Sequence, residues 1–166
     1  APRLWRAFSS VSTAVAQAPH TFRPNPPRTL DSCRYGRSAV PIDEFCAKQL
    51  VKVKFDSAEE ETKFKSCLDY FQGGYDDEEK FAQLDKALAA REAPGADRLF
   101  FLSVPPTVFG DVCTMINNQA RAAAPGKTQV LVEKPFGRDS RTFEALNTLT
   151  AAAFDETELF RLDHYL

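Results

Sequence analysis

The feature that most constrains the fold is the alternation of short apolar runs with amphipathic segments in the second half of the chain. Residues 99–104, LFFLSV, form a nearly continuous apolar run that ends at Pro105-Pro106. Such a run is typical of a strand covered on both faces. Residues 130–132 and 159–162 are two further short runs of this kind. We therefore expect three buried strands.

The segments between these strands have helical periodicity. Residues 107–123 carry apolar side chains at helical spacing and end before Pro125-Gly126. A second helix is expected to begin near Ser140. Its expected inward face consists of Phe143, Leu146, Leu149 and Ala153. Strands alternating with helices predict an α/β fold with a parallel sheet and right-handed connections.

Two more helices are expected earlier in the chain. The first runs from the acidic turn at Asp56-Ser57 to Gly73-Gly74, with Phe64, Leu68 and Phe71 at helical spacing. In the second, Asp76 or Asp77 caps a segment that closes at Pro94-Gly95. Its apolar face consists of Phe81, Leu84 and Leu88.

Composition excludes several classes of protein. The chain has 166 residues, 43% apolar and 27% charged, which is ordinary for one globular domain. No apolar run is long enough for a membrane span, and the net charge of −2 argues against a basic nucleic-acid binder. The four cysteines lack C-x-x-C spacing, and the only histidines are His20 and His164, so we expect no metal site.

The charge is divided unequally along the chain. Residues 1–30 contain four arginines and no acid, whereas the remainder carries 17 basic and 23 acidic residues. An Arg-bearing, Ser-rich, acid-free start is typical of an organelle transit segment, and a merely basic, disordered terminus is the alternative. We expect residues 1–30 to be a leader or arm and 31–166 the domain. Residues 6–10, RAFSS, favour a mitochondrion over a plastid, and the Pro-rich stretch 19–30 suits a linker or an arm lying on a partner.

Two motifs resemble a known family. VLVEKPFGRDSRTFEALN, followed after a helix by FRLDHYL, closely resembles glucose-6-phosphate dehydrogenases. RLFFLSVPPTVF, GGYDDEEKFAQLD and, more weakly, YGRSAVPIDEFCAK resemble preceding segments of the same family in the same order. The resemblance covers about residues 35–166 and implies a partial Rossmann-like sheet with flanking helices.

The resemblance assigns roles to individual residues. Lys134 would contact the sugar and the nicotinamide cofactor, NADP in this family, and Pro135 would aim the Lys134 side chain. His164 and Tyr165 would hold the sugar phosphate of glucose 6-phosphate. Asp163 would orient a catalytic histidine. Pro106 and Phe109 would lie at the cofactor, and Phe109 stands where the family commonly has Tyr.

The departures from the family are as informative as the matches. The family's G-x-x-G-D-L turn lets backbone amides approach the cofactor pyrophosphate. None of the seven glycines forms that pattern or a G-x-G: Gly36, Gly73, Gly74, Gly95, Gly110, Gly126 and Gly137. Neither histidine matches the family's general base by motif. The domain is therefore expected to lack the first βα phosphate-binding unit, to bind no cofactor as it stands, and to have no complete catalytic set.

Two functions remain open on the sequence. The first is a degenerate, catalytically inactive domain that serves as a structural or accessory subunit of a larger organellar, mitochondrial assembly. Its partners would then be other protein subunits. The alternative is a fragment or complementing chain of an active NADP-dependent enzyme that oxidises glucose 6-phosphate at C1. A sugar-phosphate sensor without chemistry is a third, less supported idea.

Overall fold

The structure is a computed structural model, and it describes residues 12–18, 32–37, 39–41, 43, 44, 47, 50, 54–134, 136, 137 and 139–162. For residues 12–18 and Ser32 it describes the backbone only. Within these ranges no helix is long and apolar enough to cross a membrane.

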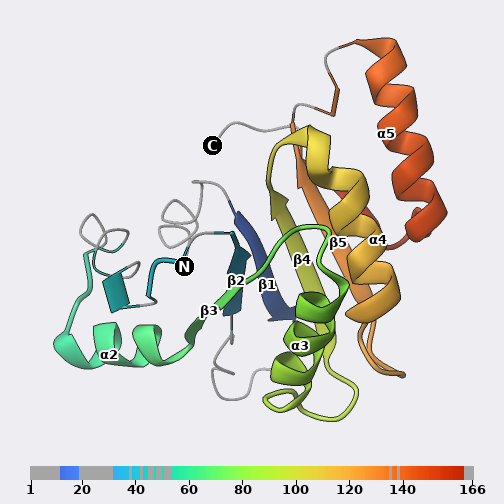
Figure 1. Cartoon of the computed structure of the whole chain (residues 1–166). Coiled ribbons are helices and arrows are strands. Elements are labelled where there is room, and N and C mark those ends of the chain that lie inside the picture. Colours follow the sequence, from blue (N-terminus) through green and yellow to red (C-terminus); the bar gives the residue numbers. More distant parts are fainter. Residues whose placement is uncertain are drawn as a thin grey trace.

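A six-stranded sheet forms the centre of the domain, with the strand order β3-β2-β1-β4-β5-β6. The strands are β1 (Ser12–Ala18), β2 (Ser32–Gly36), β3 (Leu68–Gln72), β4 (Asp97–Ser103), β5 (Thr128–Glu133) and β6 (Leu159–Leu162). β2 is parallel to β3, and β4, β5 and β6 are parallel to one another. β1 is antiparallel to both of its neighbours, β2 and β4, and its reversed direction is visible in Figure 1.

Helices connect the parallel strands. They are α2 (Ala58–Ser66), α3 (Glu78–Ala89), α4 (Phe109–Gln119) and α5 (Ser140–Ala153), and a short 3-10 helix, η2 (Pro106–Val108), runs directly into α4. α3 and α4 lie on the same side of the sheet, α5 lies beyond α4, and α2 stands away from the sheet (Figure 1). No residue of α2 is buried, so this helix adds little to the core.

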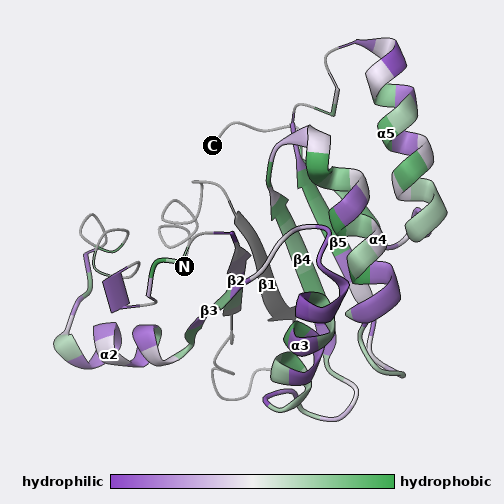
Figure 2. Cartoon of the chain, in the orientation of Figure 1, coloured by the Kyte–Doolittle hydropathy of each residue, from purple (hydrophilic) through white to green (hydrophobic). Residues whose placement is uncertain are grey.

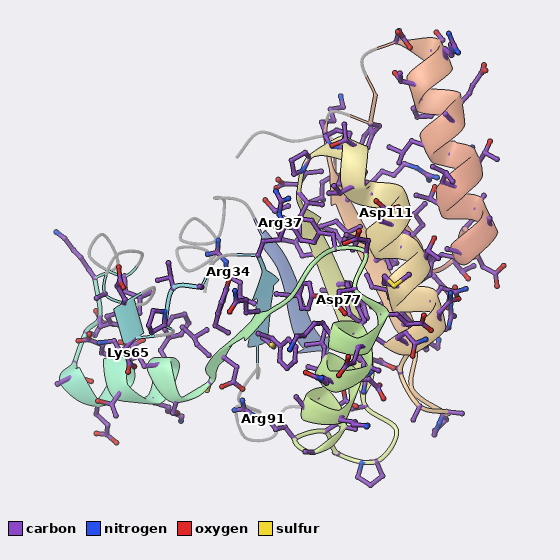
Figure 3. The ribbon with its side chains drawn as sticks, in the orientation of Figure 1. Arg34, Arg37, Lys65, Asp77, Arg91 and Asp111 are labelled. Atoms are coloured by element: carbon purple, nitrogen blue, oxygen red, sulfur yellow. The ribbon has the colours of Figure 1, made fainter. Side chains whose placement is uncertain are left out.

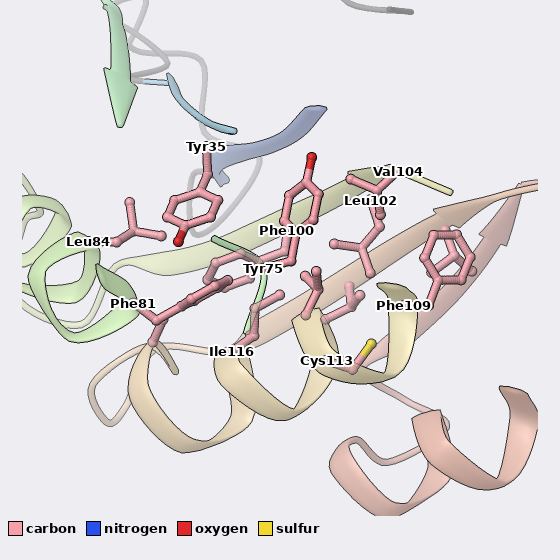
Figure 4. Close-up of a cluster of buried hydrophobic side chains, with 14 of the residues drawn as sticks. Tyr35, Tyr75, Phe81, Leu84, Phe100, Leu102, Val104, Phe109, Cys113 and Ile116 are labelled. Carbon is pink, nitrogen blue, oxygen red and sulfur yellow. The ribbon is translucent and has the colours of Figure 1, made fainter. Parts of the chain in front are cut away.

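The core lies between the sheet and the two helices α3 and α4 (Figure 4). The strands contribute alternate residues, as a pleated strand must. On β4, for example, Phe100 and Leu102 are fully buried, whereas Leu99 and Phe101 on the opposite face are half-buried. The helices contribute residues at helical spacing: Phe81, Leu84, Leu88, Phe109, Val112 and Ile116. Figure 2 shows the resulting hydrophobic band along β4 and β5.

The structure confirms the α/β fold class and its partial Rossmann-like character. The three expected strands are present as β4, β5 and β6, each within two residues of its predicted bounds. Asp77 caps α3 by accepting a hydrogen bond from the Lys80 backbone amide at 3.0 Å, and the predicted apolar face of α3 is buried. Apolar runs and helical spacing were sufficient to find these elements. The strands were expected to be covered on both faces, but they are fully buried on one face only, since Phe101 and Leu131 on the other face are half-buried. The helix expected over 107–123 is α4, which ends four residues earlier.

The long helix expected from Asp56 to Gly73 is wrong in its second half. α2 begins at the predicted turn, where Ser57 is its N-cap, but the helix ends at Ser66, and Leu68–Gln72 form β3. Leu68 and Phe71 fit helical spacing, yet hydrogen bonding to β2 decides their conformation. A short apolar run cannot be assigned by spacing alone when tertiary pairing is available.

The inward face expected for α5 is also partly wrong. Phe143 is 44% exposed and Leu149 is 53% exposed, whereas Leu146 and Ala153 pack against the core. α5 packs on α4 rather than on the sheet centre, so a narrower stripe of it is covered.

The strands β1 and β2 were not expected, and the sheet is mixed rather than wholly parallel. β1 falls within residues 1–30, the segment predicted to be a leader or arm. The boundary at residue 30 stays a prediction.

Candidate functional site

One edge of the sheet collects the carboxyl ends of all the parallel strands. Five strands end at this edge: β2 at Gly36, β3 at Gln72, β4 at Ser103, β5 at Glu133 and β6 at Leu162. Ligands of open α/β sheets bind outside this edge. We refer to it as the carboxyl edge. β1 brings its amino end here, because Ser12 pairs with Ser103 and Thr13 pairs with Tyr35.

Lys134 lies at the carboxyl edge. It directly follows β5 and is exposed. The preceding residue, Glu133, pairs with Leu162, the last residue of β6. Lys134 therefore directly follows the residue that pairs with the end of β6, and β6 contains the first two residues of the RLDHYL motif. Asp163, His164 and Tyr165 lie outside the described residues, as does Pro135, so their predicted contacts with substrate stay predictions.

Phe109 and Pro106 follow β4. Pro106 opens η2 and is half-buried, and Phe109 begins α4 with only 1% of its surface exposed. The Phe109 ring lies in the core (Figure 4) and lines a small apolar pocket with Val132 and Phe136. The ring is thus packed into the domain and does not project from the edge.

The turn after Lys134 is fixed by a glycine. Gly137 has a φ of +133°, a conformation that side chains disfavour, and a Cβ there would lie 2.7 Å from the backbone nitrogen of Phe143. Asp139 then caps α5, because its carboxylate accepts a hydrogen bond from the Thr142 backbone amide at 2.8 Å. The Thr142 hydroxyl completes a capping box by accepting from the Asp139 amide. Gly137 and the capping box thus fix how the chain enters α5.

Arg37 is an edge residue that the sequence analysis missed. It directly follows β2, it is exposed, and its guanidinium carbon lies 5.3 Å from the centre of the Tyr75 ring (Figure 3). In doubly wound folds, an arginine near this place accommodates the 2′-phosphate of NADP. The signal was the YGRS run, but its place is evident only once β2 is known to end at Gly36.

Tyr35 holds the loop beside Arg37 in place. Its hydroxyl donates a hydrogen bond to the Gly74 carbonyl oxygen at 2.6 Å, and its ring packs on Phe81 with 4.6 Å between ring centres. Burial, together with nearby Asp77, raises the pKa of Tyr35 above its ordinary value, so the hydroxyl stays protonated and can donate. The end of β2 is therefore anchored to the loop that follows β3.

The described residues do not fit the pyrophosphate of a dinucleotide at the centre of the carboxyl edge. A phosphate turn needs a strand that ends at this edge and a helix that begins there. Among the described strands, the one at the central position is β1, which ends at the opposite edge with Ala18 beside Asp97. Nor do the described residues contain a cluster of side chains suited to a metal ion.

Comparisons with known proteins agree on one family. The family model described as glucose-6-phosphate dehydrogenase, NAD binding domain, matches residues 27–166. The cytoplasmic glucose-6-phosphate 1-dehydrogenase 6 of Arabidopsis thaliana is 39% identical over 119 residues, which is 67% of this chain and 23% of that protein. The glucose-6-phosphate 1-dehydrogenase of Hyalophora cecropia is 36% identical over 152 residues, which is 89% of this chain and 98% of that sequence.

A solved structure supports the same family. A glucose-6-phosphate dehydrogenase in complex with its substrate glucose 6-phosphate superposes with a TM-score of 0.73 at 32% identity. The match covers 80% of this chain and 29% of that one. The chain thus spans about a quarter of the Arabidopsis protein and of this solved structure.

Proposed function

The chain belongs to the glucose-6-phosphate dehydrogenase family, and from that premise we propose that it is a catalytically inactive member that serves as a structural or accessory subunit of a larger organellar assembly. The observation that carries the proposal is the direction of β1. The central strand ends away from the carboxyl edge, so the described chain offers a dinucleotide no pyrophosphate turn.

The lack of a pyrophosphate turn among the described residues bears directly on activity, because hydride transfer needs a bound acceptor. The given chain by itself is therefore expected to produce no NADPH.

An uncovered apolar area supports a role in an assembly. Phe160 and Leu162 on β6 are 43% and 38% exposed. Their register neighbours Leu131 and Glu133 place them on the sheet face opposite α3 and α4. Exposed apolar side chains on an outer strand favour a protein partner.

A second candidate is a fragment or complementing chain of an active, NADP-dependent glucose-6-phosphate 1-dehydrogenase. The observation that favours it is Lys134, which lies at the end of β5 beside the strand that leads into Asp163, His164 and Tyr165. A purely structural domain has no need of this set. In this case glucose 6-phosphate and NADP are ligands.

NADPH formation from glucose 6-phosphate and NADP⁺ by the purified chain, followed by absorbance, separates the candidates. The first predicts no turnover above the buffer rate. The second predicts turnover once a complementing chain supplies the rest of an active enzyme, and Lys134→Ala then lowers this turnover by about 10²-fold or more, since a cation that steadies developing charge is lost. Lys127→Ala is the matched control, because Lys127 is also exposed but precedes β5 at the opposite edge.

The organellar location is part of the proposal and rests on the composition of residues 1–30, which must be retained after import because they contain β1. A fusion of these residues to a fluorescent protein tests it. Accumulation in mitochondria supports the proposal, accumulation in plastids supports the stated alternative, and a diffuse cytosolic signal contradicts both.

A further inference from the structure

We infer that the reversed strand β1 occupies the centre of the described sheet, and that this arrangement leaves no site there for the pyrophosphate of a dinucleotide. The inference deepens the first candidate function and rests on it. The loss of the glycine pattern would remove a phosphate-binding turn, whereas the direction of β1 removes the place where such a turn could lie.

The register establishes the direction of β1. Seven consecutive residues of β1 pair with β4, from Ser12 opposite Ser103 to Ala18 opposite Asp97. Four of them pair with β2 on the other side, from Thr13 opposite Tyr35 to Ala16 opposite Ser32. Both neighbours run the other way, so β1 is the one reversed strand among the six described strands.

The direction fixes where the chain leaves the strand. It enters β1 at the carboxyl edge and leaves it at Ala18, beside Asp97 at the start of β4. Seven residues span about 20 Å at the rise of an extended strand. The segment that follows β1 thus starts about 20 Å from the edge that carries Arg37 and Lys134. Residues 19–31, between β1 and β2, contain no glycine, so this segment also lacks the residue that a phosphate turn requires.

The sheet remains intact despite the reversal. β2 and β4 each present backbone amides and carbonyls toward the central position, and an antiparallel strand pairs with them as well as a parallel one does. The scaffold that holds Lys134 and Arg37 is therefore preserved while the central phosphate site is not. A dinucleotide loses its pyrophosphate contacts, whereas a small sugar phosphate needs none of them.

Disulfide trapping tests the direction directly. Ser12→Cys with Ser103→Cys places two thiols opposite each other if β1 is antiparallel. Ala18→Cys with Ser103→Cys is the matched control, because those thiols meet only in a parallel strand. Both pairs are made with Cys46→Ser and Cys67→Ser, which leaves the buried Cys33 and Cys113.

After oxidation and digestion, we expect mass spectrometry to detect a cross-link in the variant with Ser12→Cys and Ser103→Cys. We expect no cross-link in the variant with Ala18→Cys and Ser103→Cys. Cross-linking of the Ala18 pair overturns the inference. Cross-linking of neither pair also overturns it, because β1 then does not occupy the central position.

A titration of the full chain with NADP⁺ by calorimetry tests the consequence. We expect no saturable binding of NADP⁺ to this chain up to millimolar concentration. The Arabidopsis relative, titrated with NADP⁺ in the same way, is the positive control. Saturable micromolar binding contradicts the inference. The cross-link reports on the strand alone, and NADPH formation reports on the proposed function alone. An inactive chain with the Ala18 cross-link thus keeps the inactivity but rejects the inference, and with it the strand direction as the cause of the inactivity.

Discussion

Arg98 donates two hydrogen bonds to the Glu92 carboxylate, from Nε at 2.5 Å and from Nη2 at 3.0 Å. Arg98 is almost fully buried at the start of β4, and its Nη1 also donates to Asp85 at 2.6 Å and to the Ala120 carbonyl oxygen at 3.0 Å. Burial alone lowers the pKa of Arg98, but the hydrogen bonds with Glu92 and Asp85 raise it, so the guanidinium stays charged. One cation thus joins α3, the loop after it, β4 and the end of α4.

Removal of Glu92 should therefore be costly. Glu92→Ala removes the carboxylate that accepts two hydrogen bonds from the buried Arg98 guanidinium. We expect the free energy of unfolding, measured by urea denaturation, to fall by about 3 kcal/mol. The control is Glu61→Ala, which breaks the exposed pair with Lys65 on α2 and should cost less than about 0.5 kcal/mol. Equal losses in the two variants contradict the account.

Gly73→Ala should destabilise the fold by overpacking. A Cβ at Gly73 would lie 2.0 Å from the Tyr35 hydroxyl oxygen and 2.8 Å from the Cβ of Lys80. We expect a loss of about 1–3 kcal/mol in urea denaturation, since the Tyr35 ring is held on both sides. Gly74→Ala is the control, because its Cβ would meet no atom closer than 3.1 Å. A loss for Gly73→Ala that is no larger than the loss for Gly74→Ala contradicts the prediction.

Substitution of two adjacent residues of β6 should cost very different amounts of stability. Leu159 is 6% exposed on the helix side of the sheet, and Phe160 is 43% exposed on the other side. Leu159→Ala should lose about 2–4 kcal/mol in thermal or urea unfolding, and Phe160→Ser less than about 1 kcal/mol. A larger loss for Phe160→Ser indicates that this face is covered in solution.

The buried thiols should resist alkylation. Burial raises the pKa of Cys33 to about 11 and that of Cys113 to about 12, so neither forms much thiolate near neutral pH. Cys67 is only half-buried. With iodoacetamide at pH 8 and peptide mass mapping, Cys67 should react first, and Cys33 and Cys113 only on addition of denaturant. Reaction of Cys113 at the rate of Cys67 in the native protein contradicts this order.

The cap of α5 should make stability sensitive to acid. Hydrogen bonds from the Thr142 amide and hydroxyl lower the pKa of Asp139 below its ordinary value. Since the pKa is lower in the folded state, this stabilisation is present above about pH 4 and is lost as the pH falls through the folded value. Asp139→Asn keeps a good cap but does not titrate. The thermal midpoint of the wild type should fall more steeply below pH 4 than that of Asp139→Asn, and parallel curves contradict the prediction.

The sequence predicts this fold where burial imposes a strong pattern. β4 and β5 alternate between buried and half-buried residues, and α3 presents Phe81, Leu84 and Leu88 at helical spacing. β2 and β3 were missed because each is five residues long and is defined by pairing with the other. The direction of β1 has no sequence signature at all, since side chains alternate identically in either direction.

The site is predictable to a similar extent. Lys134 could be placed at the carboxyl edge from its motif and from the strand before it. Phe109 could be placed after β4, but its nearly complete burial depends on packing against Val132 and Phe136. The place of Arg37 at the carboxyl edge could not be predicted, because it follows β2, a strand that the sequence did not reveal.

The central position of β1 also sets an order for assembly of the sheet during synthesis. β1 and β2 are close in the chain, but the other partner of β1 is β4, with Ser12 opposite Ser103. Until the ribosome has released β4, one edge of β1 has no native partner and is open to pairing with strands of other chains. A nascent chain that stops before Ser103 should therefore aggregate, whereas one that extends through β6 should remain soluble.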